Sequence, residues 1–397
     1  MPDIRLMPMA GINTVSEDAA LMVGGDNPKV YLRDAVNVDL SPAGKANLRP
    51  DIRRVSTAGY RNLWQSPLHG DVFGTLGSDW VRIFPDAWSY ETLEPGVGQG
   101  IAYHEVLNNL VCVAAPAGLF TFNGSHSQPL TIQTPPAPLA VTGSGSLPAG
   151  TYGAAIAWLR GSVESATSEI AFANIPETGG LVITFPLCMD STITGVRLYL
   201  TAQNGGELFR GEDYPVATTS VTIPLLPERG APPQFQNLSP MPTGKYLKYW
   251  RGRLLTAKGN VLRFSEPLAY HLHDERHGFV QLPQRITFVQ PVDGGIWVGQ
   301  VNHVVFLSGT GLNDLVLQRK AAKSPIPGTA VLLDADTAGP DLAQGGSAVA
   351  FWLAENGYVV GNSAGGLVEL HTGKLSGITG KSGTSVVLDQ RVMTAVT

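Results

Sequence analysis

The chain has 397 residues, of which 43% are hydrophobic and 15% are charged, and its formal net charge is −5 at pH 7. This negative charge argues against binding of nucleic acid through a largely basic surface, but it is compatible with a passive contact with DNA. The 46 glycines and 29 prolines favour short strands joined by frequent turns and argue against long helices. The length predicts two or more domains, although large all-β units can exceed that expectation.

Two cysteines, Cys112 and Cys188, lie inside or beside apolar stretches. They are too few for a disulfide framework and lack the spacing of metal ligands, so we expect buried free thiols in a reducing compartment. The N-terminal stretch has no long apolar segment, and no run of about 18 apolar residues occurs in the chain. The sequence therefore predicts a soluble protein that carries no readable export signal and does not insert into a membrane.

Residues 1 to about 60 contain turn-forming clusters at 24–28 and 41–44. Between them, residues 30–40 alternate between apolar and polar side chains, which predicts a strand. Ser16–Met22 is the one segment expected to be helical, with Ser16 as its cap and acidic residues in its first turn. We expect this region to form an arm or the first strand pair.

One layout then occurs five times: an apolar run, a turn of small residues and a second apolar run. The copies start at residues 71, 109, 253, 295 and 348, so neighbours are separated by 38, 42 and 53 residues, with one gap of 144. Each copy has the pattern of a β-hairpin, with turns at 257–260 and 301–303 in the third and fourth. A spacing of about 40 to 50 residues is typical of four-stranded blades, so the repeats predict an all-β fold, a β-propeller of about six blades.

An insertion explains the long gap. Prolines border residues 135–240 on both sides, as in stiff linkers. Six or seven short strands are expected between them, near residues 152–158, 170–172, 181–185, 196–200, 207–210 and 220–225. This spacing predicts an inserted immunoglobulin-like or fibronectin-like β-sandwich. The expected domains are therefore 1–134, an arm with the first part of the propeller; 135–240, the sandwich; and 241–397, the rest of the propeller.

The segment Gly361-Asn362-Ser363-Ala364-Gly365 matches the G-x-S-x-G pattern of a hydrolase nucleophile. That pattern must lead from a strand into a helix, whereas the residues after Ser363 predict a second strand. An acid and then a histidine should follow the serine, but His371 precedes Asp389. We therefore interpret the segment as a hairpin turn.

The segment from His271 to His277 contains three histidines and two carboxylates. In an extended conformation, His271, His273, Glu275 and His277 would share one face and could hold a divalent metal. The alternative is a polar connection between repeats, which explains the interleaved charges equally well. The sequence favours the polar connection and leaves metal binding by His271, His273 and His277 open.

Three weaker patterns complete the candidates. The glycine-rich segment 96–100 follows no clear strand and opens no helix, so a surface turn is favoured over a phosphate-binding loop. A basic group interleaved with Tyr246, Tyr249 and Trp250 could contact nucleic acid, although solvated strand edges are favoured. Its cations are Lys245, Lys248, Arg251, Arg253, Lys258 and Arg263. Carboxylate pairs for glycan chemistry are Asp334 with Asp336 and Asp274 with Glu275, but the sequence does not show whether either pair converges.

Several segments together resemble the tail nozzle proteins of short-tailed bacteriophages, also called tail tubular or DNA-stabilising proteins. They are Asn37-Val38-Asp39 with Gly44 and Arg49-Pro50, VRLYLTAQNGGELFRG from Val196, YLKYWRGRLLTAKGNVLRFSEPLAYH from Tyr246, GGIWVGQ from Gly294 and VVFLSGTGLNDLVLQR from Val304. The resemblance covers most of the chain in scattered pieces. It implies a β-propeller interrupted by a small β domain, with six copies in a ring below the portal and adaptor.

The resemblance implies a non-enzymatic structural protein of the virion tail, assembled in the bacterial host cytoplasm, that serves genome retention and ejection. It carries over no catalytic, cofactor-binding or metal-binding residues. The implied partners are further copies of the chain in a homohexamer, the portal and adaptor, and tail fibre or spike proteins. Two alternatives stay open from the residues: a propeller that binds or cleaves carbohydrate, and a propeller scaffold that binds a host protein.

The charge of the chain suits a channel that DNA must slide through. Many cations on a channel wall would release counterions at each phosphate contact and hold the genome back. A ring of six chains would instead carry six times −5, or −30. We therefore expect a wall that repels and centres the duplex, with only passive contact with double-stranded DNA.

Overall fold

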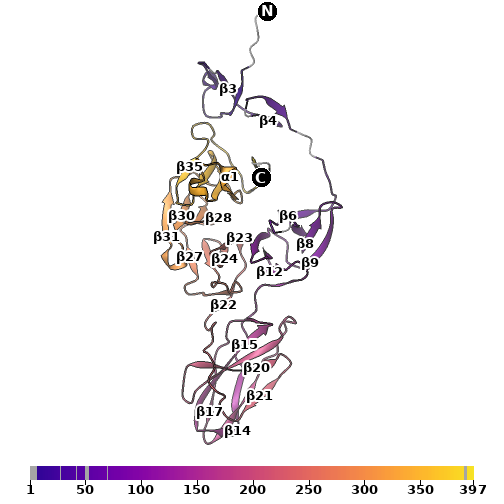
Figure 1. The fold of residues 1–397 in the computed structure, drawn as a ribbon, viewed down its shortest axis with the longest axis vertical. Helices are drawn as coiled ribbons and strands as arrows, with labels where there is room; N and C mark the ends of the chain where they lie inside the picture. The colour runs from indigo at the N-terminus through magenta and orange to yellow at the C-terminus, as the bar shows by residue number, and fades with distance from the viewer. Residues whose placement is uncertain (1–6, 27, 42, 50–52, 69, 389–390) are drawn as a thin grey trace, which may run out of the picture. The chain divides into compact units, whose positions relative to one another are not determined.

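The computed structural model describes residues 7–26, 28–41, 43–49, 53–68, 70–388 and 391–397 (Figure 1). The chain forms two compact units, one of Met1–Ala58, Ala257–Val261 and Gln281–Thr397, the other of Gly59–Thr256 and Leu262–Val280. Within the described residues the fold is almost all β, and the longest helix, α1 (Ala335–Ala338), has four residues. No helix in this part of the chain is long and apolar enough to span a membrane.

Five four-stranded antiparallel sheets, named A to E here, account for most strands. Sheet A is β6 (Tyr60–Gln65), β7 (Val72–Leu76), β8 (Asp79–Phe84) and β9 (Ser89–Glu94); sheet B is β10 (Tyr103–Leu107), β11 (Leu110–Ala115), β12 (Gly118–Phe122) and β13 (Ser127–Pro129). Sheet C is β23 (Lys245–Trp250), β24 (Arg253–Lys258), β25 (Val261–Phe264) and β27 (Phe279–Gln281). Sheet D is β28 (Ile286–Val292), β29 (Gly295–Gln300), β30 (Val304–Ser308) and β31 (Val316–Lys320); sheet E is β32 (Val331–Leu333), β33 (Val349–Ala354), β34 (Gly357–Gly361) and β35 (Leu367–Glu369).

The five predicted hairpins are confirmed, because each is the central strand pair of one of these sheets. Two-residue turns are typical where a glycine or asparagine tolerates a positive φ. The hairpin of sheet C turns at Gly259, whose φ is +64°, and the following Asn260. Its strand β24 extends to Lys258, so the turn is shorter than the four residues predicted.

The central strands are apolar on both faces because the sheets stack face to face. In β11, Val111 and Val113 pack in one core with Phe73 and Trp80 of sheet A. The alternate residues Cys112 and Ala114 pack in a second core with Leu247 and Leu254 of sheet C. Since successive side chains of a strand point to opposite faces, a strand between two sheets must be apolar throughout.

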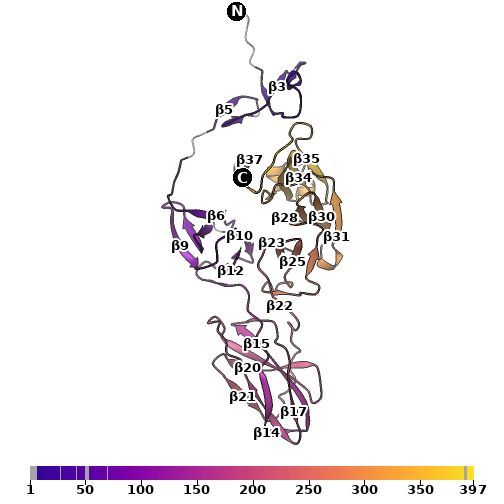
Figure 2. The ribbon, with the colours of Figure 1, turned by 180° about the vertical axis from the view of Figure 1, so that it is seen from behind.

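Sheets D and E lie next to each other in the ribbon (Figure 2). They pack in the same way, through aromatic side chains. The rings of Trp297 and Trp352 lie 5.5 Å apart, and Phe288 lies 5.1 Å from Trp352. All three side chains are fully buried. Such ring contacts add about 0.5–1.5 kcal/mol each to the free energy of burial.

Residues 139–223 form two further sheets around one core (Figure 1). Their strands are β14 (Leu139–Leu147), β15 (Gly150–Arg160), β16 (Val163–Glu164), β17 (Ala171–Ile175), β18 (Gly179–Thr184), β19 (Gly195–Thr201), β20 (Leu208–Pro215) and β21 (Ser220–Ile223). The sheet orders are β14-β18-β21 and β16-β15-β19-β20, with β17 also paired to β15. Strand β14 was not predicted, because its Gly and Ser residues hide the alternation that marks a strand.

Polar contacts join these two sheets to the rest of the second unit. The guanidinium of Arg160 donates to the carbonyls of Pro129 at 2.6 Å and Thr131 at 3.3 Å. His271 bonds the Glu164 carbonyl through Nε2 at 2.8 Å. Around His271, the buried residues Ala166, Ala269 and Leu272 pack together. A strand pair of β22 (Ser239–Pro240) and β26 (Leu272–His273) lies beside this junction.

The arm, defined here as residues 7–48, differs from its prediction. It contains the sheet β1 (Met9–Ile12), β3 (Lys29–Leu32), β2 (Met22–Val23) and the hairpin β4 (Val38–Leu40) with β5 (Ala46–Leu48). The predicted helix is only the 3-10 turn η1 (Asp18–Leu21). Its N-cap position is Glu17 rather than Ser16 and has no side-chain cap, while the Ser16 hydroxyl accepts from the Asn13 side chain. The strand predicted over 30–40 is broken at Asn37, whose φ is +56°.

The C-terminal residues form a hairpin of β36 (Gly383–Leu388) and β37 (Arg391–Val396). It is attached to sheet E by the Tyr358 hydroxyl, which bonds Thr394 Oγ1 at 3.0 Å. The 3-10 turns η2 (Leu312–Asp314) and η3 (Gln344–Gly346) complete the elements. Both cysteines are free thiols, and burial raises the pKa of Cys112.

We predict that residues 135–240 fold on their own, since their two sheets enclose a common core. Replacing them with a short Gly/Ser linker should leave a folded β protein, although the loss uncovers Ala269 and Leu272. Circular dichroism tests this on two proteins, the chain in which the linker replaces residues 135–240 and the isolated segment 135–240. If neither product folds, the division is wrong.

His104 should make the second unit sensitive to acid. It is buried against Trp64, and its Nε2 accepts from the Trp80 indole N–H at 3.1 Å. Burial lowers the pKa of His104 to about 3. As the pH falls through about 6.5, this histidine is protonated in the unfolded chain but stays neutral in the folded chain. The free energy of unfolding therefore falls by about 2 kcal/mol between neutral pH and pH 5.

Urea unfolding at several pH values tests the role of His104. The His104→Gln variant should be less stable at pH 7.5 but should lose less stability on acidification than the wild type. Burial also lowers the pKa of His271, His303 and His371, so the difference between the two chains isolates His104. His126→Gln, at an exposed position, is the matched control. Equal acid sensitivity of His104→Gln and wild type would contradict the assignment.

Candidate functional site

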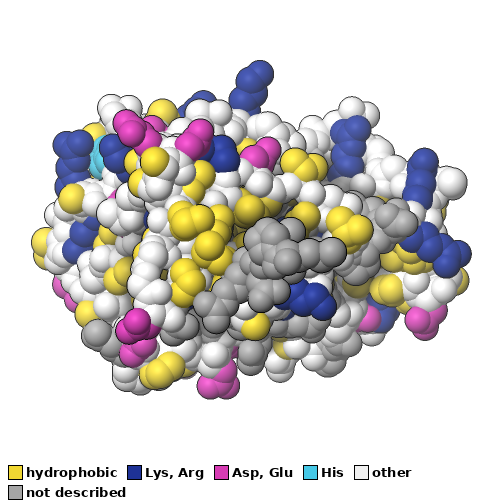
Figure 3. Space-filling view, turned by 90° about the horizontal axis from the view of Figure 1, so that it is seen from above, with side chains coloured by type: hydrophobic (Ala, Val, Ile, Leu, Met, Phe, Trp, Pro, Cys, Tyr) yellow, Lys and Arg dark blue, Asp and Glu magenta, His cyan; other side chains and the backbone are white. Residues whose placement is uncertain are grey.

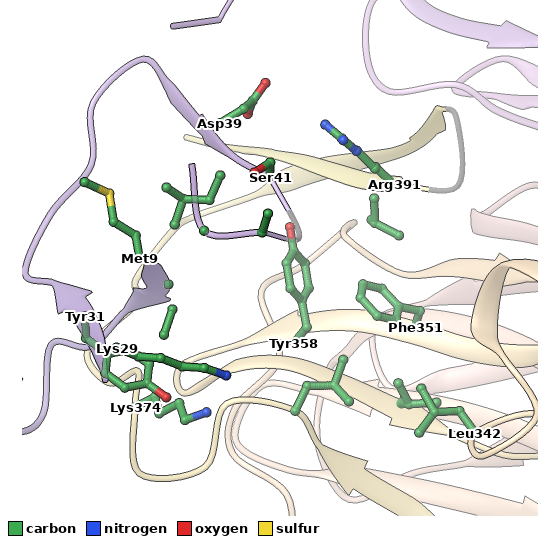
Figure 4. Close-up of a pocket in the computed structure, with 18 of the residues that line it drawn as sticks. Met9, Lys29, Tyr31, Asp39, Ser41, Leu342, Phe351, Tyr358, Lys374 and Arg391 are labelled. Carbon is green, nitrogen blue, oxygen red and sulfur yellow. The ribbon is translucent and has the colours of Figure 1, made fainter. Parts of the chain in front are cut away.

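The outer face of sheet E and the arm enclose a cavity of about 1090 Å³ (Figure 4). Its wall on the sheet side is apolar and includes Phe351, Tyr358 and Val360. Phe351 and Val360 are buried against Leu333 and Val349, and Val392 of the C-terminal hairpin packs beside them. This face of sheet E is therefore covered by chain segments rather than by another four-stranded sheet.

The arm supplies the opposite wall, and its shape depends on one glycine. Gly44 has a φ of +77°, and a Cβ there would lie 2.6 Å from Pro8 Cβ. The close approach lets the Met9 N–H donate to the Gly44 carbonyl at 2.9 Å, which ties the β4–β5 hairpin to β1. Arg49 and Asp39 form an ion pair at 2.7 Å across the same hairpin.

Cations surround the cavity. Lys29, Lys374 and Arg391 line it, and Asp39 is its one acidic lining residue among those the structure describes. The Lys374 ammonium lies 5.4 Å from the centre of the Tyr31 ring, a cation–π contact. Figure 4 shows Lys29 and Lys374 on one side of the cavity and Arg391 near Ser41 on another. Sequence analysis missed this site, since its residues are distant in the chain and no local motif connects them.

Ser363 lies in the turn between β34 and β35, as the hairpin interpretation predicted. The glycines of the motif have a packing role: a Cβ on Gly361 would lie 2.4 Å from Trp297, and one on Gly365 would lie 2.5 Å from Phe306. The Asn362 side chain closes the turn by accepting from the N–H groups of Ala364 and Gly366. The motif is thus explained by a turn that fits over the aromatic core of sheet D.

The three histidines of segment 271–277 have separate partners. His271 bonds the Glu164 carbonyl, His273 bonds the Phe264 carbonyl through Nδ1 at 2.9 Å, and His277 bonds Asp274 at 3.0 Å. Within the described residues, no group of three His, Cys, Asp or Glu side chains could hold a metal. His271 and His273 are also buried, which the interpretation as a polar connection between repeats did not predict.

The basic group does not form one open face. Lys248 lies 3.8 Å from Glu105, and the Arg253 guanidinium donates to the Ser265 carbonyl at 2.5 Å. Trp250 is only 3% exposed and packs edge-on against Phe264, so it cannot stack on a base. On the face shown in Figure 3, Lys and Arg side chains are scattered among Asp and Glu.

The glycine-rich segment and the carboxylates also serve local structure. Val97 is fully buried in the core between sheets A and B, and the Gly96 N–H donates to Asp79. Asp334 caps α1 by accepting from the Thr337 N–H at 2.7 Å. Asp274 accepts from the Arg276 N–H at 2.8 Å.

An ion-pair network lies on the β16-β15-β19-β20 sheet. Arg197 donates to Glu164 at 2.6 Å and to both oxygens of Asp213 at 2.8 Å. The hydrogen bond from Arg197 lowers the pKa of Asp213, which stays ionised at neutral pH. Tyr199 donates to Glu164, and its pKa is raised by burial. Each charged group is paired, so the network suits a structural role better than acid–base chemistry.

No protein-family model matches the chain, and a search of curated proteins finds no similar sequence. Among solved structures, the chain is similar to apo AztD from Citrobacter koseri at 11% identity and a TM-score of 0.31, over 87% of this chain and 74% of that one. A structure of BBS1N in complex with ARL6DN has 11% identity and a TM-score of 0.33, over 86% and 91% of the two chains. Sqt1 from Saccharomyces cerevisiae has 10% identity and a TM-score of 0.29, over 79% and 74%.

We predict that His273→Ala lowers the free energy of unfolding by about 2 kcal/mol, since it removes a buried hydrogen bond and leaves a void. His277→Ala and Ser363→Ala are the controls and should change it by no more than about 0.5 kcal/mol, because His277 is exposed and Ser363 is a half-buried residue of a turn. Thermal or urea unfolding measures all three.

A metal chelator separates this structural role from a metal site. It should leave the unfolding curves of the wild type and of His273→Ala unchanged. A chelator that destabilises the wild type to the level of His273→Ala would contradict the structural role of the imidazole.

Proposed function

We propose that the chain is a structural component of a short-tailed phage virion, a tail nozzle that assembles as a ring of six and extends the portal and adaptor channel. Its role is to retain the genome and to conduct it during ejection. The proposal combines the segments that resemble nozzle proteins with the arrangement of sheets and exposed surfaces described above. Further virion proteins, the portal or adaptor on one face and fibres or spikes on another, complete the proposed assembly.

In the proposed architecture, sheets A to E are blades of a β-propeller. Face-to-face stacking of sheets A, B and C in one unit and of D and E in the other supports this assignment. The β36–β37 hairpin, whose Ser385 hydroxyl donates to the Thr329 carbonyl at 2.7 Å beside sheet E, is proposed to contribute to a sixth blade. Residues 135–240 are the proposed immunoglobulin-like insertion, supported by their two sheets and common core.

The observation that carries the assembly proposal is the apolar outer face of the β36–β37 hairpin. Val386 and Met393 are paired across the two strands, and their exposures are 53% and 48%, beside Leu388 at 55%. Among the described residues, each of these strands pairs only with the other. At the start of β36 the Gly383 N–H donates to the Pro327 carbonyl at 2.8 Å, and the rest of the hairpin has no further strand paired beside it in this part of the chain. Exposed apolar side chains next to open strand edges are typical of surfaces that a protein partner covers.

The ring can be tested by mass and by imaging. Six chains of 42.1 kDa give about 253 kDa, which mass photometry resolves from a monomer. We expect closed rings in negative stain. The Met393→Glu variant places a charge on the proposed interface and should shift the population toward monomers, whereas Thr384→Glu, near the start of the same hairpin, is a milder control. A wild-type chain that stays monomeric at every accessible concentration would refute the ring.

The channel role predicts weak DNA binding. We expect a dissociation constant for double-stranded DNA no lower than about 10 μM at physiological salt, weaker than the tighter end of ordinary non-specific binding. A titration of fluorescent duplex at two salt concentrations measures it. Submicromolar affinity with a steep salt dependence would contradict a passive channel and give the basic group around Lys245 and Arg263 a direct role.

A further inference from the structure

The arm has no core of its own. Asn13 is its one buried residue within the described part, and none of its described apolar side chains is buried. Met22 is 57% exposed, Val36 is 78% exposed and Leu48 is 79% exposed. A segment that buries so little apolar surface cannot hold its own structure, so contacts with other surfaces must stabilise it.

The contact between the arm and its own chain is thin. Thr14 accounts for two hydrogen bonds, from its N–H to the Lys374 carbonyl at 2.8 Å and from the Ser376 N–H to its hydroxyl at 3.2 Å. Lys374 adds the contact with the Tyr31 ring. Beside these contacts lies the cavity of about 1090 Å³ rather than packed side chains (Figure 4). Well-packed interfaces approach the packing density of protein interiors, whereas the contact between the arm and sheet E leaves this space unfilled.

The surface on which the arm lies, formed by sheet E and the loop that carries Lys374 and Ser376, is held by contacts of its own. The rings of Phe351 and Tyr358 pack against each other on the outer face of sheet E, with their centres 4.8 Å apart and their planes tilted by 35°. The loop that carries Lys374 and Ser376 is held by the Lys374 N–H, which donates to the His371 carbonyl at 2.9 Å. The surface can therefore receive an arm from any copy that presents one.

The connection permits exchange. The 11 residues of segment 49–59 join the arm to sheet A. A fully extended chain of this length reaches roughly 36 Å, far enough to pass from one compact domain to the next. When two copies exchange an identical segment, each segment makes the same contacts on the other copy that it makes within its own chain. The exchange therefore links the copies at a low cost in free energy.

We propose that, in the assembled ring, the arm of each copy docks on sheet E of the neighbouring copy. Thr14 of one chain then meets Lys374 and Ser376 of the next, and the exposed apolar side chains of the arm pack between the two copies. If the arms pass in one direction around the ring, each copy gives one arm and receives one, and the contacts between copies are head-to-tail. This proposal rests on the ring assembly proposed above and specifies how its copies are joined.

Co-expression of two variants of the full chain, Thr14→Cys and Ser376→Cys, tests the exchange, with the native free thiols removed in both by Cys112→Ala and Cys188→Ser. A disulfide between residues 14 and 376 can form in this mixture only if the arm of one chain lies on another. We expect a linked species of two chains after mild oxidation, several-fold more abundant than in either variant alone, and mass spectrometry should identify the 14–376 peptide pair. The double variant Ser385→Cys/Thr394→Cys, within one hairpin, is the control and should link only internally.

The outcomes separate the exchange from the ring itself. If the double variant Thr14→Cys/Ser376→Cys forms rings but only internal disulfides, the exchange is wrong and the ring stands. If no sample forms the 14–376 disulfide, the docking contact is absent and the exchange is also wrong. If the wild-type chain does not assemble at all, the ring proposal fails first, and the mass measurement shows this independently.

Discussion

Face-to-face stacking of the four-stranded sheets is the constraint on which most of this structure depends. A strand between two neighbours must be apolar on both faces, and β11 shows the result, with Val113 in the core shared with sheet A and Cys112 in the core shared with sheet C. Between sheets D and E the space is filled by large aromatic rings, including those of Trp297 and Trp352. The same rings account for glycines such as Gly361, where a side chain would collide with Trp297.

Polar groups have a different role in this fold, because they join parts that share little apolar surface. Arg160 reaches the carbonyls that follow sheet B, and His271 reaches the carbonyl of Glu164. Burial lowers the pKa of His271, so a neutral imidazole makes this bond at physiological pH. Such contacts are directional and fix an orientation, whereas apolar packing alone would tolerate sliding. His271, which suggested a metal ligand, is used in this way.

The proposed assembly would give a common physical reason for three features of the single copy. The described part of the arm has no buried apolar side chain, the C-terminal hairpin pairs with no further strand among the described residues, and a cavity lies between the arm and sheet E. In the proposed nozzle these surfaces meet neighbouring copies, while the negative net charge keeps contact with DNA weak. The exposed apolar residues are then interface residues rather than a cost to stability.

The sequence by itself determined the all-β character and the five hairpins, because a strand buried on both faces and a glycine turn are local patterns with one physical interpretation. It also identified the turn at Ser363, since the residues that follow predict a second strand rather than a helix. Local patterns could not show that His271 and His273 are buried, because burial depends on how segments pack, and His271 bonds the carbonyl of Glu164 from a distant part of the chain. Likewise, residues 30–40 alternate like one strand but break at Asn37, and the cavity beside sheet E joins Lys29 to Lys374. Only the tertiary structure decided these features, because burial and cavities depend on which segments meet.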